Sequence, residues 1–327
     1  MAEFEEGPSD LPGVTLFDSD KNPCRKRTGV YWPKYDSEKS YTNLDVVVWL
    51  HGLYVTNART LLTADSAEVR KTILASGKDV VLIAPFIGST DGYYSLANGL
   101  SGGGFGQSYL DQVLEGLARY HQRCSGAQAT PALRIRKLIL AGHSAGGWSM
   151  RQLVQSLGRY ASQLSECWGF DCLYAGSNKP RSDDDAAFWY GRSSGDSAAP
   201  LHIFAGASTI HQSVKLALMA KGLATPTGQQ ANPRKGEVSS IHVALSGSTL
   251  ANASTLGVFI SGLAGKPESG ALPAAPKQPN TPEELKATYA YKIADEAAKA
   301  HPMSGSMEAH YQIAKTYFLL RLKSGIL

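Results

Sequence analysis

The chain has 327 residues, of which 43% are hydrophobic and 18% are charged, enough to bury the core of one large domain or two ordinary ones. Its formal net charge is only +4, and the one dense basic cluster, residues 24–27, is short and lacks interleaved aromatic residues, which argues against a nucleic-acid partner. No apolar run approaches the ~20 residues that cross a bilayer. Residues 1–6 are acidic and do not have the apolar core of a secretory signal. The compartment stays open on this basis, with a cytoplasmic location favoured over export.

The first 44 residues differ in character from the rest. They are polar and interrupted by Pro12, Pro23 and Pro33, which predicts an extended arm over the surface of a domain that spans residues 45–327. Within that domain, residues 177–198 and 248–300 are predicted insertions that could form a lid over a site.

Short apolar runs rich in β-branched residues alternate with amphipathic stretches along this domain. Such runs are typical of strands buried on both faces of a parallel sheet, and they occupy residues 45–50, 79–85, 138–141, 168–174, 201–205 and 241–245. Residues 107–122 and 147–164 carry apolar side chains at helical spacing. The alternation predicts an α/β fold with a mostly parallel central sheet and helices on both faces. Ligands on such sheets bind at the carboxyl ends of the strands.

The C-terminal third is predicted to contain two further helices. Residues 265–282 are rich in Pro, Ala, Gly and Ser, which is typical of a linker. A capping-box pattern at residues 281–284 then starts a helix that should reach about Ala300. A final amphipathic helix is expected from about Tyr311 to Lys323.

The segment Gly142-His143-Ser144-Ala145-Gly146 matches the G-x-S-x-G pattern of a serine nucleophile. Two other segments, around Ser101 and Ser193, match the same letters but lie in polar, glycine-rich loops. Only Ser144 follows a predicted strand and precedes a predicted helix, the context in which a sharp turn exposes the serine. The helix N-terminus beside it favours the negative charge that develops in acyl transfer.

With Leu50-His51-Gly52-Leu53 after the first strong strand and this serine motif after the third, the chain resembles the α/β-hydrolase family of serine esterases and lipases. The resemblance covers about residues 45–245 and the last helix, and it implies an α/β-hydrolase fold. It also implies an oxyanion hole made by the backbone N–H groups of Leu53 and Ala145. The His51 ring is expected to pack within its turn.

In that family the acid usually follows the strand two beyond the strand of the nucleophile, but residues 201–235 contain no Asp or Glu. Asp171 ends the strand that directly follows the nucleophile's helix, a position that some members use. A carboxylate within an apolar run needs a partner, and a histidine N–H would supply it. The alternative is a buried residue with a purely structural hydrogen bond. The acidic cluster at residues 183–185 is expected to be solvated.

The resemblance places the base on a loop after the last strand and before the final helix, where His310 lies. This gives the chain order Ser, Asp, His that the family uses. A departure from the family is the long insertion between the last strand and His310. His211 and His242 remain alternative bases.

These residues predict a serine hydrolase that cleaves a carboxylic ester through an acyl-enzyme. We expect no metal and no cofactor, because the acyl-enzyme reaction needs neither. The four cysteines also fit no metal-ligand spacing. The expected partner is a small-molecule or lipid-like ester, and the sequence indicates no oligomeric state. Candidate substrate contacts are His51, Tyr93, Tyr94, Phe105 and Trp189. The rival interpretations are an acyltransferase or serine peptidase on the same fold, and a non-catalytic binding protein on a hydrolase scaffold.

Overall fold

The computed structural model describes a defined part of the chain, which falls into two compact units. The first unit comprises Met1–Ser165 and Phe318–Leu327, and the second comprises Glu166–Tyr317. The described residues are 3–18, 28–64, 66–88, 105–173, 185–193, 199, 201–204, 209, 216, 241–243, 307–323 and 327. The linker and the helix predicted between residues 265 and 300 lie outside them.

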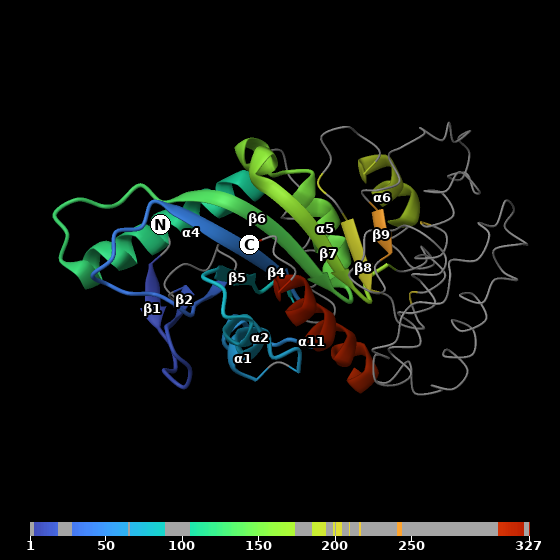
Figure 1. The fold of residues 1–327 in the computed structure, drawn as a ribbon, viewed down its shortest axis with the longest axis horizontal. Helices are drawn as coiled ribbons and strands as arrows, with labels where there is room; N and C mark the ends of the chain where they lie inside the picture. The colour runs from blue at the N-terminus through green and yellow to red at the C-terminus, as the bar shows by residue number, and fades with distance from the viewer. Residues whose placement is uncertain are drawn as a thin grey trace, which may run out of the picture. The chain divides into compact units, whose positions relative to one another are not determined.

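In the described part of the first unit, six strands form a sheet in the order β1-β2-β3-β5-β4-β6 (Figure 1). The pairs β4–β5 and β4–β6 are parallel, and the pairs nearer the N-terminus are antiparallel. The bounds are β1 Phe4–Glu6, β2 Val14–Asp18, β3 Thr28–Trp32, β4 Asn43–Leu50, β5 Val81–Pro85 and β6 Arg134–His143. The strands predicted at residues 45–50, 79–85 and 138–141 are therefore confirmed.

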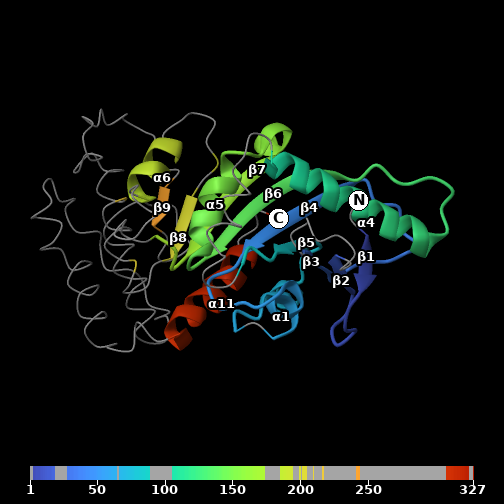
Figure 2. The ribbon, with the colours of Figure 1, turned by 180° about the vertical axis from the view of Figure 1, so that it is seen from behind.

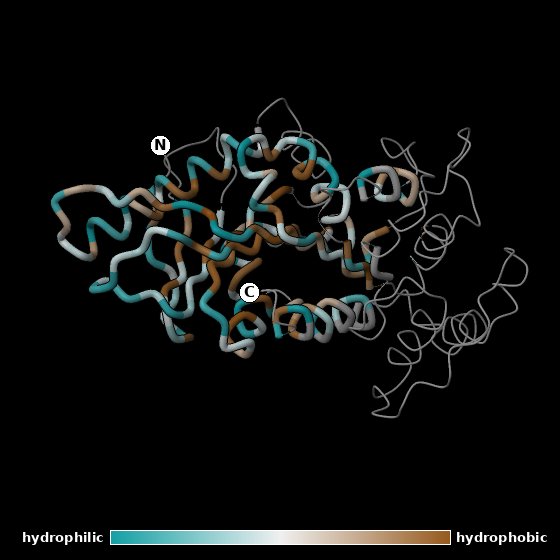
Figure 3. The backbone as a smooth tube through the Cα atoms, turned by 45° about the horizontal axis from the view of Figure 1, so that its top comes forward, coloured by the Kyte–Doolittle hydropathy of each residue, from teal (hydrophilic) through white to brown (hydrophobic). Residues whose placement is uncertain are grey.

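The central strand β4 shows why the apolar runs form strands. Its residues 46–50 are completely buried, because neighbouring strands flank β4 on both sides and helices cover the sheet. A strand buried on both faces has no solvent-facing alternation, so it is apolar throughout. Figure 3 shows the apolar segments of the described chain concentrated along these strands.

The N-terminal segment is not the surface arm expected from its prolines. β1, β2 and β3 extend the sheet, with β3 antiparallel to β5, and Val30 and Tyr31 are fully buried. Pro12 lies between β1 and β2, and Pro33 directly follows β3, so neither interrupts a ladder of hydrogen bonds. Proline is tolerated at such positions. Pro12 and Pro33 therefore lie just outside the strands and do not exclude them.

Helices cover both faces of the sheet of the first unit. α4 (Phe105–Ser125) and α5 (Gly146–Val154) lie on one face, and α1 (Ala58–Thr63) and α2 (Val69–Ser76) lie on the other (Figures 1 and 2). The helix predicted at residues 107–122 is confirmed, but the one predicted at 147–164 stops at Val154. A short 3-10 helix, Gly158–Gln163, follows. Its first residue, Gly158, has a left-handed backbone (φ 52°), which a continuous α-helix from 147 to 164 would not contain.

Among the described residues of the second unit, three parallel strands follow in the order β7-β8-β9, although the first residues of β7 belong to the first unit. Their bounds are β7 Leu164–Phe170, β8 Leu201–Phe204 and β9 Ile241–Val243. α6 (Asp185–Ser193) belongs to this unit, and the last helix, α11 (Met307–Lys323), begins in it and ends in the first unit. Phe204 stacks on Phe170 and on Tyr317 of α11, with ring centroids 5.4 and 4.8 Å apart. Among the described residues, no helix combines the length and apolar character that a membrane crossing requires.

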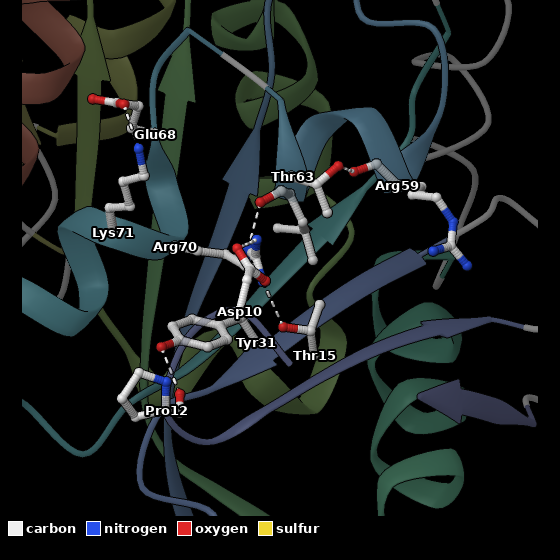
Figure 4. A network of polar contacts seen from close by, with 10 residues as sticks. Asp10, Pro12, Thr15, Tyr31, Arg59, Thr63, Glu68, Arg70 and Lys71 are labelled. Atoms are coloured by element: carbon white, nitrogen blue, oxygen red, sulfur yellow. Dashed lines mark hydrogen bonds and ion pairs between the residues drawn. The ribbon is translucent and has the colours of Figure 1, made fainter. Parts of the chain in front are cut away.

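Arg70 of α2 anchors the N-terminal strands to the helical layer (Figure 4). Its buried guanidinium donates to the Leu62 carbonyl (2.5 Å), the Thr15 hydroxyl (2.9 Å) and both carboxylate oxygens of Asp10 (3.0 and 2.9 Å). The hydrogen bond from Arg70 lowers the pKa of Asp10 below its usual value. The guanidinium therefore connects the chain between β1 and β2 to α1 and α2.

We predict that Arg70→Met lowers the free energy of unfolding by about 1–3 kcal/mol, because the buried Thr15 hydroxyl and Leu62 carbonyl lose their donor. Asp10→Asn is the matched control. It should cost less than about 1 kcal/mol, since the carboxylate is half exposed and its ion pair is screened by water. Urea unfolding of both variants measures the difference. Equal losses in the two variants would contradict a structural role for the buried half of the network.

Candidate active site

Ser144 occupies a sharp turn between β6 and α5. Its backbone is left-handed (φ 54°), a conformation that residues other than glycine rarely adopt without a structural reason. Gly147 N–H donates to the Ser144 carbonyl (3.0 Å), and Trp148 N–H donates to the Ala145 carbonyl (3.1 Å), so the helix begins at once. Ser144 itself is half-buried, at the carboxyl end of a buried strand.

The backbones approach closely on both sides of this turn, so that glycine is required after it and little space is left before it. A Cβ atom on Gly146 would lie 1.9 Å from the Leu50 carbonyl oxygen at the end of β4. A Cβ atom on Gly142 would lie 3.0 Å from the Gly146 carbonyl oxygen. Any side chain at Gly146 would push α5 away from β4 and open the turn that holds Ser144.

The turn after β4 lies directly beside the Ser144 side chain. A Cβ atom built on Gly52 would be 2.8 Å from the Ser144 Cβ atom and 3.2 Å from its Oγ atom. The next two residues are Leu53, which is half-buried, and Tyr54, which has a left-handed backbone (φ 69°) and a 65% exposed side chain. The first unit thus brings together Ser144, the following Ala145 and the backbone of residues 51–53.

The His51 ring stabilises this turn through two hydrogen bonds to the main chain. Its Nε2 atom accepts the Ile87 N–H (3.0 Å), so Nδ1 carries the proton and donates to the Gly52 carbonyl (2.6 Å). The ring also stacks on Phe86, with centroids 5.7 Å apart. Burial lowers the pKa of His51 to about 4. Both ring nitrogens bind main chain, so the ring packs within the turn as expected and has no nitrogen left for a substrate.

Asp171 and His310 meet in the second unit. Asp171 follows β7 with a left-handed backbone (φ 47°), and its N–H donates to the Phe204 carbonyl at the end of β8 (2.6 Å). Its carboxylate is fully buried, and the Oδ2 atom lies 2.5 Å from His310 Nδ1. A neutral histidine that donates from Nδ1 to a carboxylate presents Nε2 as its basic atom.

The helix α11 begins at Met307, so His310 lies in its first turn rather than on the expected loop before it. His310 is 9% exposed, and its ring is in edge contact with Tyr311. The helix therefore begins four residues earlier than the sequence predicted.

One partner of Asp171 was missed by sequence reasoning. The buried Thr209 hydroxyl donates to Asp171 Oδ1. The only signal in the sequence was its place shortly after the apolar run at 201–205. Parallel pairing of β7 with β8 brings the ends of these two strands side by side.

The structure describes some of the remaining predicted site residues, and others lie outside the described ranges. Trp189 of α6 is buried, and Asp185 is buried at the start of that helix, whereas the acidic cluster was expected to be solvated. Phe105 is the first residue of α4. His242 lies in β9. Tyr93, Tyr94 and His211 lie outside the described residues. Within the described ranges, no group of three His, Cys, Asp or Glu residues is arranged to hold a metal ion.

We predict that the buried His51 makes the fold sensitive to acid. Its pKa in the folded chain is about 4, below the ordinary 6.5, so folding excludes the proton. Above pH about 6.5, His51 is neutral in both the folded and the unfolded chain, and the free energy of unfolding keeps its full value. As the pH falls from 6.5 toward 4, only the unfolded chain takes up the proton, so the free energy of unfolding decreases by up to about 1.4 kcal/mol per pH unit. His51→Gln, which can donate and accept without titrating, should lose less stability between pH 7 and pH 5 than the unmodified chain. Parallel urea-unfolding series at both pH values that show equal losses would rule this out.

No protein-family model matches the chain, and no curated protein matches it. Among solved structures, it is similar to a fluorophosphonate-binding serine hydrolase of Staphylococcus aureus (15% identity, 60% of this chain and 80% of that chain, TM-score 0.38). It is also similar to an S-formylglutathione hydrolase from Agrobacterium tumefaciens (14%, 62% and 78%, TM-score 0.38). A third is a feruloyl esterase module from Clostridium thermocellum (13%, 62% and 71%, TM-score 0.34).

With a left-handed serine between strand and helix and parallel strands around β4, the chain has the α/β-hydrolase fold.

Proposed function

We propose that this protein is a serine hydrolase that cleaves carboxylic esters, with Ser144 as nucleophile, His310 as general base and Asp171 as the residue that orients the base. The observation that carries the proposal is the strained turn at Ser144, whose side chain lies against the Gly52 backbone. Strain of this kind is retained where the surrounding structure holds it and is concentrated at functional sites. The buried Asp171–His310 pair adds the two groups that such a nucleophile needs.

In the proposed reaction, Ser144 Oγ attacks the carbonyl carbon of the ester and its proton passes to His310 Nε2. The N–H groups of Leu53 and Ala145 donate to the oxyanion of the tetrahedral intermediate. His310 then protonates the departing alcohol oxygen, which leaves an acyl group on Ser144. A water molecule attacks this acyl-enzyme, with His310 again taking and returning the proton. The products are a carboxylic acid and an alcohol.

The substrate we propose is a small-molecule or lipid-like ester. Tyr93, Tyr94, Phe105 and Trp189 are our candidates for the walls of its binding site. Trp189 packs edge-on against the half-buried Phe188, with ring centroids 5.1 Å apart. His51 contributes through the turn that it fixes, because both of its ring nitrogens bind main chain.

We predict that a fluorophosphonate probe labels Ser144 and that Ser144→Ala abolishes labelling. Turnover of a short p-nitrophenyl ester should fall by about 10⁴-fold or more in the same variant, because the acyl-enzyme of the proposed reaction forms on Ser144 Oγ. Ser193→Ala is the matched control, since Ser193 lies in the same sequence pattern but at the end of α6. Mass spectrometry of the labelled protein identifies the modified residue. An adduct on Ser193, or ester turnover that survives Ser144→Ala, would refute the assigned nucleophile.

We predict that removing either the base or the acid also lowers kcat for ester hydrolysis. His310→Ala should lower kcat by several orders of magnitude, and Asp171→Asn should lower it by about 10⁴-fold, since an amide would hold the imidazole in the wrong tautomer. Combining either change with Ser144→Ala should add little, because the three residues act as one unit. Steady-state kinetics of the single and double variants tests this. Full activity in His310→Ala would reject this base and bring His211 forward.

A further inference from the structure

We infer that Thr209 is a positioning residue that fixes the carboxylate of Asp171 for His310. The inference rests on the proposed function, because it concerns how the acid of that site is held. It comes from the pattern of hydrogen bonds around one buried carboxylate, in which each oxygen has a different partner.

The strand pairing explains how Thr209 reaches Asp171. β7 and β8 run parallel with Phe170 opposite Phe204, so the residues that follow both strands emerge at the same edge. Asp171 is the first residue after β7, and its N–H donates to the Phe204 carbonyl. Thr209 comes five residues after β8 ends and is 1% exposed. Its hydroxyl donates to Asp171 Oδ1.

A fully buried carboxylate requires this kind of support. Asp171 has no exposed surface, so an oxygen without a donor would carry a large desolvation cost. The χ2 torsion of aspartate is broad and sets few limits on the rotation of the carboxylate by itself. With Oδ1 held by Thr209, the carboxylate plane is fixed and Oδ2 faces the Nδ1 atom of His310. The Thr209 hydroxyl thus stabilises the carboxylate of Asp171 and fixes its orientation toward His310.

The test compares Thr209→Val, which has nearly the same shape but no hydroxyl, with Thr209→Ser, which keeps the donor. We expect Thr209→Val to lower kcat roughly 10- to 100-fold, as the loss of a hydrogen bond to a charged group does, while KM stays within about twofold. Thr209→Ser should restore most of kcat. Thr28→Val is the matched control, because it removes another buried threonine hydroxyl, bonded to the Tyr109 hydroxyl at 3.0 Å, away from Asp171. This control should lower stability but leave kcat unchanged.

A second readout needs no substrate. The proton between His310 Nδ1 and Asp171 should give a far-downfield proton NMR signal, because a short hydrogen bond to a carboxylate deshields it. The signal should shift or weaken in Thr209→Val and recover in Thr209→Ser. The inference is overturned if Thr209→Val keeps its kcat, if the signal is unmoved, or if serine fails to restore kcat. Failure of the proposed function looks different, since Ser144 would then stay unlabelled while the signal still responded to Thr209.

Discussion

The site depends on the close approach of α5 to the end of β4. Gly146 lies so near Leu50 that any side chain would overlap the Leu50 carbonyl, and this contact keeps Ser144 in a left-handed turn. Such a conformation costs on the order of 1–3 kcal/mol and persists only when its surroundings enforce it. Here the enforcing structure is the parallel pair β4–β6, in register from residue 45 to Leu50, together with the buried His51 ring.

The second unit meets a different constraint, which is to provide polar partners for carboxylates that are buried within an apolar sheet. Asp171 meets it with the Thr209 hydroxyl on one oxygen and the His310 ring on the other. Glu166 of β7 is also buried, and it receives the Trp168 indole N–H at 2.5 Å and lies 3.3 Å from His202 Nε2. Asp171 differs because it stands after its strand, in a strained backbone, where parallel strands present their ligand-binding residues.

Sequence patterns predicted the central strands and the Ser144 turn because both depend on local features. The apolar runs reflect burial on two faces, and the serine motif was separated from its two matches by the strand before it and the helix after it. β2 and β3 were missed because prolines at the strand ends masked β-branched and aromatic runs. The shortened α5 and the early start of α11 depended on details that helical spacing does not encode. Thr209 was beyond prediction because its partner lies 38 residues away and is brought near only by strand pairing.

A crystal structure of the protein with a phosphonate bound covalently, as a mimic of the tetrahedral intermediate, would show whether Ser144, His310 and Asp171 act together. We expect the phosphorus to be bonded to Ser144 Oγ and one oxygen to lie about 2.7–3.1 Å from the N–H groups of both Leu53 and Ala145. We also expect His310 Nε2 within hydrogen-bond distance of Ser144 Oγ, with Nδ1 still bound to Asp171. A phosphonate on another residue, or a His310 ring out of reach of Ser144, would refute this catalytic assignment.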